Sequence, residues 1–228
     1  MWDWESIITS FKEMIVVGVP TSLILTVSAL ILGFVLAILI TVMRSLWEGK
    51  IAGRLAEMFV IFFTGTPLLV QMFLIYYGPG QFEWVKNTFL WAAFGNAWFC
   101  GILALALNSA AYSSQLFYGA LKNISQEQWN SCLALGMNKR EAFRPLFSLA
   151  LRRALPSYSN EIVLVFKSTS LVSVIALLDI MGVAREWAGR TYDQLTYFLV
   201  AAVIYLAING VLIAVAKTIE SKALAFEK

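Results

Sequence analysis

Five long apolar stretches divide the chain of 228 residues, and short polar segments separate them. A helix that crosses a bilayer needs roughly 20 predominantly apolar residues. The first stretch is too long for a signal-peptide core and has no basic flank before it, so we expect it to be retained. The pattern predicts an all-α integral membrane protein, one domain over residues 1–228, with spans at Met14–Met43, Leu55–Tyr77, Phe94–Leu121, Ala154–Leu178 and Leu195–Ala216.

The basic residues between these stretches predict an orientation. Alternate segments carry one, one and two Lys or Arg residues, against three, six and three in the segments between them. Cytoplasmic loops of membrane proteins carry the excess of Lys and Arg. We therefore expect the N-terminus outside the cell and the C-terminus inside.

Composition agrees with a membrane protein and removes several classes of function. The chain is 60% hydrophobic and 14% charged, with a mean hydropathy of +0.75. Its formal charge of +3 gives little support for a nucleic-acid partner. Because the chain has no histidine, it has no Ser-His-Asp or Cys-His catalytic set. Cys100 and Cys132 fit no metal spacing, and no Walker A loop for ATP occurs.

The polar segment after the third apolar stretch predicts two short helices on the inner face. Ser125 and Gln128 form a capping box that starts the first helix, and Gly136 suits the left-handed position that ends it. Asn138 and Glu141 repeat the capping pattern and predict a second short helix. Two interpretations stay open: an amphipathic hairpin lying at the lipid headgroups, or a docking element for a cytosolic partner.

The second apolar stretch is interrupted by Thr64–Pro67. Proline removes a backbone donor from a helix, and a carbonyl freed in lipid must find a partner or line a wet cavity. The motif therefore predicts either a kink satisfied by threonine hydroxyls, or part of a translocation path lined by Thr64, Thr66 and Gln71. Gly78–Gly80 then predicts a turn that ends the stretch.

The fourth apolar stretch contains two charges, Glu161 and Lys167. Six residues of helix turn through roughly 600°, so the two side chains point to different faces and cannot pair on one helix. Glu161 is interpreted either as a carboxylate bonded to a neighbouring helix or as a group in a substrate vestibule that attracts a guanidinium. Lys167 is interpreted as a structural charge that pins helix packing. Asn160, Ser168 and Ser22 are further candidates for the path.

The inner polar segment resembles the cytoplasmic loop of ABC-importer permeases, whose pattern is E-A-A, three residues, G, and a later L-P. Here Asn130–Cys132 occupies the E-A-A positions, Gly136 is the glycine, and Leu155-Pro156 is the L-P pair. Asn130 departs from the pattern, because the family has Glu there.

Other parts of the chain resemble the same family. Phe62–Phe82 and Leu107–Leu121 are similar to the polar amino-acid branch of these permeases, and most of all to the M-type membrane subunits of bacterial arginine transporters. Gln115 departs again, since many relatives have Glu at this place.

The resemblance implies a type I importer fold in a bacterial inner membrane. It implies a coupling loop at about residues 122–153 that inserts into a separate ATPase, which binds ATP-Mg; this chain would bind no cofactor. The other implied partners are a second, similar permease subunit, a second copy of the ATPase and a periplasmic amino-acid-binding protein. The implied substrate is arginine, with histidine, lysine, ornithine or other polar amino acids as alternatives. The residues implied in coupling are Asn130, Ser131, Cys132, Ala134, Gly136, Met137 and Arg140.

Other classes of function fit the residues less well. An ion channel would need a filter or a ring of charges. An intramembrane enzyme would need a catalytic set, and Asp179 and Asp193 are predicted to lie in an outer loop. A membrane scaffold would require neither charges within spans nor a capped inner loop. The sequence therefore favours the permease subunit of an importer.

Overall fold

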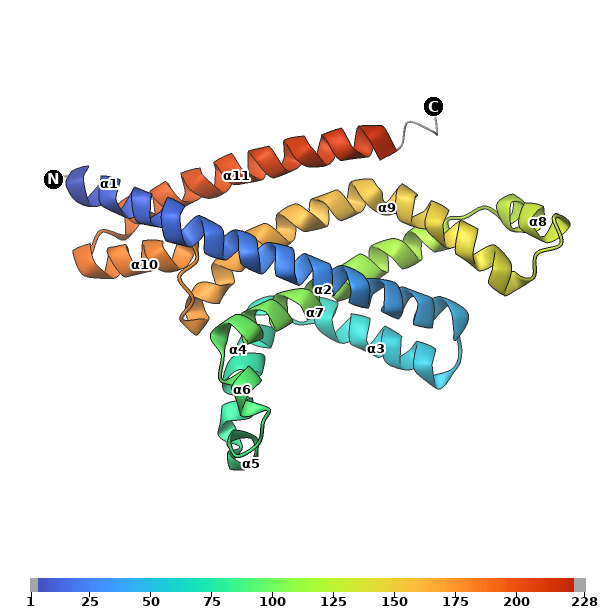
Figure 1. Cartoon of the computed structure of the whole chain (residues 1–228), viewed down its shortest axis with the longest axis horizontal. Coiled ribbons are helices and arrows are strands. Elements are labelled where there is room, and N and C mark those ends of the chain that lie inside the picture. Colours follow the sequence, from blue (N-terminus) through green and yellow to red (C-terminus); the bar gives the residue numbers. More distant parts are fainter. Residues whose placement is uncertain (1–3, 224–228) are drawn as a thin grey trace.

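The computed structural model describes residues 4–223, and these residues form helices with no strand among them. The predicted all-α class is confirmed for this part of the chain. The long helices α2, α7, α9 and α11 run along the molecule (Figure 1). Helix α7 packs between α2 and α9, and α11 packs against α9. Their bounds are Val19–Leu46 for α2, Ala97–Lys122 for α7, Lys139–Ser168 for α9 and Gln194–Ala223 for α11.

The first long helix is longer than the predicted Met14–Met43. Helix α1 (Trp4–Glu13) continues through a π-helical turn at Met14–Gly18 into α2, so that helical structure runs unbroken over 43 residues. At Gly18 a Cβ atom would lie only 2.8 Å from the Ile180 Cα. The glycine therefore allows this helix to contact the backbone at the start of α10 (Ile180–Thr191).

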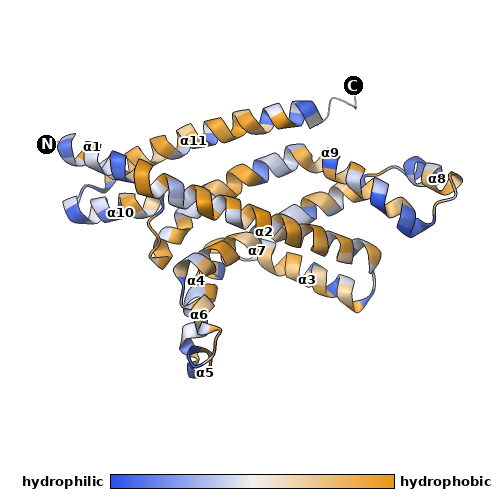
Figure 2. Cartoon of the chain, in the orientation of Figure 1, coloured by the Kyte–Doolittle hydropathy of each residue, from blue (hydrophilic) through white to orange (hydrophobic). Residues whose placement is uncertain are grey.

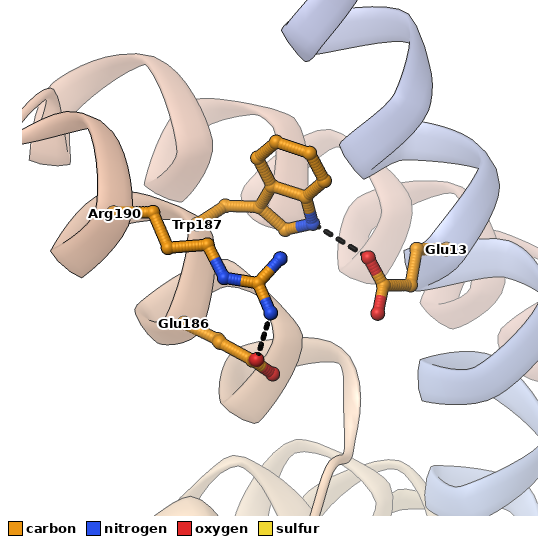
Figure 3. Close-up of polar contacts among 4 residues, drawn as sticks. All are labelled: Glu13, Glu186, Trp187 and Arg190. Atoms are coloured by element: carbon orange, nitrogen blue, oxygen red, sulfur yellow. Dashed lines mark hydrogen bonds and ion pairs between the residues drawn. The ribbon is translucent and has the colours of Figure 1, made fainter.

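A hydrogen bond fastens α1 to α10 (Figure 3). The Trp187 indole Nε1 donates to the Glu13 Oε2 at 2.7 Å. The Arg190 guanidinium lies over the Trp187 ring, 5.4 Å from its centre, and pairs with Glu186 one turn away. Glu13 ends α1, so this contact lies directly before the π-helical turn.

Small side chains let α2 and α7 approach closely. A Cβ atom at Gly33 would lie 3.1 Å from the Ala106 carbonyl oxygen. The Thr41 Oγ1 donates to the Ala37 carbonyl at 2.6 Å and lies 3.3 Å from the Ser114 Oγ. This small-residue packing is the form that helix association takes in membranes. The buried positions of α2 that form the stripe repeat every four residues: Leu25, Ala29, Gly33, Ala37 and Thr41.

The predicted second stretch consists of two helices. Helix α3 (Ile51–Gly65) and α4 (Leu68–Tyr77) meet at the Thr64–Pro67 motif and are bent by 106°. The chain therefore breaks where the sequence predicted an interruption, but far more sharply than a kink. Helix α4 ends at Tyr77 as predicted, and short helical turns follow at Pro79–Gln81, at Glu83–Lys86 (α5) and at Trp91–Phe94 (α6).

The prediction of a second short helix on the inner segment is wrong. The first short helix is α8 (Gln126–Ala134), but the Asn138 cap starts α9, which continues for 30 residues through Pro145 and Pro156. Two prolines cost α9 two backbone donors, and burial of one face compensates for this loss. The buried residues of the α9 segment in question are Ala142, Leu146, Ala150 and Ala154, at spacings of four.

The predicted outer loop before the last span is mostly helical, because α10 covers Ile180–Thr191. The 3-10 stretch at Thr169–Ile175 that follows α9 lies within the predicted fourth span. Asp179, directly before α10, is fully buried. It caps α10 by accepting from the Gly182 N–H at 2.8 Å, and it accepts from the Tyr205 hydroxyl of α11 at 2.9 Å. A buried carboxylate is stabilised by such donors, which explains its place in the core.

Length and hydropathy support a membrane protein. Three helical stretches of the described residues are long and apolar enough to cross a bilayer alone, and up to five crossings result if each bent pair is one span. Apolar residues predominate along α2 and α11, whereas α9 is mixed, and polar residues gather at α10 and around α8 and the start of α9 (Figure 2). The exact number of five spans and the orientation stay predictions.

Candidate functional site

The break between α3 and α4 is held by two side-chain amides. Pro67 has no N–H, so the Phe63 carbonyl loses its helical donor. The Gln71 Nε2 replaces that donor at 2.9 Å, and the Asn108 Nδ2 of α7 adds a second bond at 3.1 Å. The Asn108 Nδ2 also donates to the Gln71 Oε1 at 3.1 Å. A residue of α7 therefore fixes the geometry of the break.

Threonine hydroxyls satisfy other carbonyls near the break. The Thr64 Oγ1 donates to the Val60 carbonyl at 2.8 Å, and the Thr66 Oγ1 donates to the Phe62 carbonyl at 2.7 Å. The Thr66 carbonyl accepts from the Gln71 Nε2 at 2.9 Å. Both interpretations of this motif thus have a basis, because the hydroxyls satisfy backbone groups and, as described next, the same threonines border a cavity.

A cavity of about 440 Å³ lies between this break and the facing sides of α7 and α9. Glu161 and Ser168 line it from α9, and Thr64 and Thr66 line it from the break. Four of the predicted path residues therefore meet at one cavity. The sequence interpretation did not include Asn108 and Tyr112 of α7, which complete its polar lining.

Two further hollows continue this cavity toward the α8 end of the molecule. The first, of about 540 Å³, includes Glu161, Asn160 and Gln115, and the second, of about 440 Å³, includes Gln115 and Arg153. Neighbouring hollows share lining residues, so they form one track between α7 and α9. We call this track the polar groove and define it by its polar residues: Thr64, Thr66, Asn108, Tyr112, Gln115, Asn123, Arg153, Ser157, Asn160, Glu161 and Ser168.

The spacing of these residues explains why they share a groove. On α9, Arg153, Ser157 and Glu161 follow one another at intervals of four, which keeps them near one face of the helix. On α7, Asn108 and Tyr112 stand four residues apart. The same rule applied to the third apolar stretch would have identified these two residues, since each is polar within a membrane helix.

Glu161 and Lys167 lie on different faces of α9, as the six-residue spacing predicts. Glu161 is only 7% exposed, and it lines two of the three hollows of the polar groove. Lys167 is exposed and forms no salt bridge within residues 4–223. Glu161 therefore faces the groove, whereas Lys167 forms no ion pair that would hold another helix among residues 4–223.

Two predicted path residues lie outside the lining of the groove. The Gln71 side chain is buried behind the break and supports its wall through the bonds described above. Ser22 is fully buried in α2, where its Oγ accepts from the Ile180 N–H at 3.4 Å. The structure places Ser22 against the start of α10 and not beside Glu161.

The predicted coupling residues divide between two sides of α8. Gly136 has a φ of +82°, the left-handed conformation that the sequence predicts, and both capping boxes are present. Cys132 and Met137 are half-buried and pack with Trp129 against α9, so they hold α8 in place. The exposed residues of this set are Asn130, Ser131, Ala134, Gly136 and Arg140.

The lining of the groove can form hydrogen bonds and ion pairs with a polar solute. It offers amides, hydroxyls and the Glu161 carboxylate, with the Arg153 guanidinium at the α8 end. The carboxylate suits a cationic, hydrogen-bonding group. Among residues 4–223, no group of three or more Cys, Asp or Glu side chains could hold a metal ion.

Comparison with known proteins gives consistent relatives. The arginine ABC transporter permease protein ArtM of Haemophilus influenzae is 52% identical over 96% of both chains, and ArtM of Escherichia coli K12 is 48% identical over 92% of this chain and 95% of its own. The nopaline transport system permease protein NocM of Agrobacterium fabrum is 43% identical over 92% of this chain and 87% of its own.

Solved structures agree with the fold. The crystal structure of an amino acid ABC transporter with histidines matches with a TM-score of 0.86 and 27% identity, over 97% of this chain and 99% of the other. An inward-facing structure of the MetNI methionine ABC transporter matches with a TM-score of 0.68 at 12% identity, which supports the fold alone. The family model of the binding-protein-dependent transport system inner membrane component matches residues 29–224. The chain therefore belongs to the family of inner membrane components of binding-protein-dependent transport systems.

Proposed function

We propose that this chain is one of two permease subunits of an ATP-driven importer, and that arginine passes along its polar groove. The chain is a transport subunit rather than an enzyme, as its named relatives are. The observation that carries the proposal is the polar groove itself, with a nearly buried carboxylate at its middle.

The groove supports a path rather than a closed binding site. It continues along α7 and α9 from the α3–α4 break to the α8 end. A second, similar permease subunit would cover its open side, and the two chains together would enclose a route through the membrane. Specificity would come mainly from a periplasmic binding protein, with the groove as a weaker filter.

Glu161 favours a cationic substrate. A guanidinium presents two parallel donors to a carboxylate, and this pairing replaces lost hydration well. Two ArtM proteins among the relatives carry arginine in their names, and the NocM protein carries nopaline in its name. Histidine, lysine, ornithine and other polar amino acids are the alternatives.

The exposed face of α8 fits the coupling role. Asn130, Ser131 and Ala134 are exposed, while Trp129 and Cys132 pack against α9. A rigid attachment of this kind would pass a movement of a bound ATPase to α9, and thus to one wall of the groove. In this proposal two ATPase subunits bind ATP-Mg, five spans cross a bacterial inner membrane, and the α8 end faces the cytoplasm.

The proposal is tested by measuring arginine uptake by the reconstituted transporter complex that contains a Glu161→Gln subunit. Loss of a hydrogen bond to a charged group costs about 1.5–3 kcal/mol, so uptake at sub-saturating arginine should fall about tenfold or more. Competition by histidine, lysine and ornithine on the unmodified complex ranks the alternative substrates. Glu57→Gln is the matched control, because Glu57 is an exposed carboxylate on α3. Unchanged arginine uptake by a normally assembled Glu161→Gln complex would refute the role of the groove.

A further inference from the structure

A second cavity, of about 750 Å³, lies at the α8 end of the molecule, apart from the polar groove. It is enclosed by the end of α2, the turn into α3, the end of α7, helix α8 and the start of α9. Of its lining residues, only Arg140 belongs to the coupling set described above, and the proposed function gives the cavity itself no role. We call it the basic pocket.

The charge of its lining is strongly positive. Lys50, Lys122, Lys139 and Arg140 line the pocket, against one carboxylate, Glu48. Lys122 already pairs with Glu48 at 3.6 Å. Lys50, Lys139 and Arg140 are exposed and form no salt bridge among residues 4–223. The pocket therefore gathers three cationic side chains that no acidic group of the described chain neutralises.

A stack of side chains supports one wall of the pocket. The Arg44 guanidinium lies 4.2 Å from the centre of the Tyr118 ring, and the Lys122 ammonium lies 4.8 Å from it. Arg44 belongs to α2 and Tyr118 to α7, so the stack connects the ends of two candidate spans. This arrangement adds further positive charge beside the pocket.

The remaining walls are apolar and aromatic. Leu46 and Leu121 are close to the ends of α2 and α7, where membrane helices leave the hydrocarbon region. Trp47 and Trp129 also line the pocket, and tryptophan is enriched at this depth of a bilayer. One cavity thus combines cations with apolar walls at the ends of two candidate spans.

We propose that the basic pocket binds an anionic phospholipid, with its phosphate among Lys50, Lys139 and Arg140 and its acyl chains against the apolar walls. Basic pockets between membrane helices are the sites that recognise anionic headgroups. Charge complementarity favours an anion, and the apolar walls at the ends of two spans favour a lipid over free phosphate. The apolar walls also favour a lipid over a soluble protein, because a soluble partner would bind the exposed face of α8 instead. A lipid held here would contact both Trp129 of α8 and Trp47 of α2.

Native mass spectrometry of the purified full-length chain tests this proposal. Dioleoyl phosphatidylglycerol is titrated against dioleoyl phosphatidylcholine, and we expect the anionic lipid to be retained at least about tenfold more strongly. The double variant Lys50→Gln/Lys139→Gln should lose about tenfold of this retention, and Lys50→Arg/Lys139→Arg should keep it. The control Lys217→Gln/Lys222→Gln removes the same charge from exposed positions of α11 and should change retention less than about twofold.

Each other outcome overturns the proposal. Equal retention of the two lipids by the unmodified chain shows that the pocket does not select an anionic headgroup. Equal losses in the two Lys→Gln double variants show general attraction to charge. Displacement of the lipid by excess inorganic phosphate shows a site for free phosphate. Normal lipid retention by Lys50→Gln/Lys139→Gln, together with loss of a co-purified ATPase, shows that the pocket is a protein contact.

Discussion

The two amides at the α3–α4 break provide a quantitative test of how this membrane helix tolerates its proline. Gln71→Met keeps the length of the side chain and removes its hydrogen bonds. The Thr66 carbonyl then loses its donor at 2.9 Å, while the Phe63 carbonyl keeps the Asn108 donor at 3.1 Å. An unsatisfied buried acceptor costs about 1–3 kcal/mol. These bonds are part-buried and border a cavity, so we expect about 1–2 kcal/mol of lost stability.

Asn108→Leu should cost less by itself, because the Gln71 Nε2 continues to satisfy the Phe63 carbonyl at 2.9 Å. It loses the bond to the Gln71 Oε1, which is worth about 0.5–1.5 kcal/mol. In the double variant the Phe63 carbonyl loses both donors. Each single change also removes the Asn108–Gln71 hydrogen bond, so the sum of the two single losses counts this bond twice. The unsatisfied Phe63 carbonyl should cost more than that one bond. The double variant should therefore lose about 0.5–1.5 kcal/mol more stability than the two single variants together.

Equilibrium unfolding in mixed micelles, followed by tryptophan fluorescence and circular dichroism, measures these free energies. Gln115→Met is the control, because Gln115 is exposed. This substitution makes the same chemical change without removing a hydrogen bond at the α3–α4 break. Strictly additive losses would show that the two amides do not share the Phe63 carbonyl. A larger loss for Gln115→Met than for Gln71→Met would show that the loss does not come from the hydrogen bonds at the break.

Two further substitutions test the connections of α10 and α8. Trp187→Phe removes the 2.7 Å hydrogen bond to Glu13 and should lower the free energy of unfolding by about 1–2 kcal/mol, measured by thermal unfolding. The control Trp84→Phe, at an exposed site, should leave the free energy of unfolding unchanged. Equal effects of the two substitutions would contradict the role of the bond. Gly136→Ala should strain the turn by roughly 1–2 kcal/mol and reduce co-purification of an ATPase while membrane insertion persists, since a residue with a Cβ disfavours a φ of +82°. Gly210→Ala, in a helix with open space around it, is the control, and loss of insertion in Gly136→Ala would assign the glycine to folding instead.

Local signals in the sequence predicted much of the inner segment. Capping boxes depend on side chains three residues apart, so the starts of α8 and α9 and the Gly136 turn could be read directly. The length of α9 could not, because Pro145 and the basic residues near it are typical of a loop. The burial of Ala142 and Leu146 stabilises this part of α9, and burial depends on the tertiary structure.

The site was predictable where a polar residue interrupts apolar sequence, and less so elsewhere. Glu161 and Thr64 are polar residues within predicted membrane spans, and they line one cavity. Asn108 was not predicted, because neither a charge nor a proline marks its position in the sequence, and its partners Phe63 and Gln71 lie on other helices. The burial of Asp179 was not predicted, because one of its donors is Tyr205, which follows 26 residues later in the chain. No local pattern reveals such a partner.

The polar groove as a substrate path is the central claim, and cysteine accessibility tests it most directly. A cysteine is introduced at Asn160, with both native cysteines, Cys100 and Cys132, replaced, and the assembled transporter is treated with a membrane-impermeant thiol reagent with and without arginine. Asn160 lines the groove, whereas Leu206 of α11 is 74% exposed on the apolar surface and serves as the control position. We predict that the Asn160 position is modified from water and protected by arginine, and that Leu206 is not modified. An Asn160 cysteine that the reagent cannot reach, or that arginine does not protect, would contradict the path.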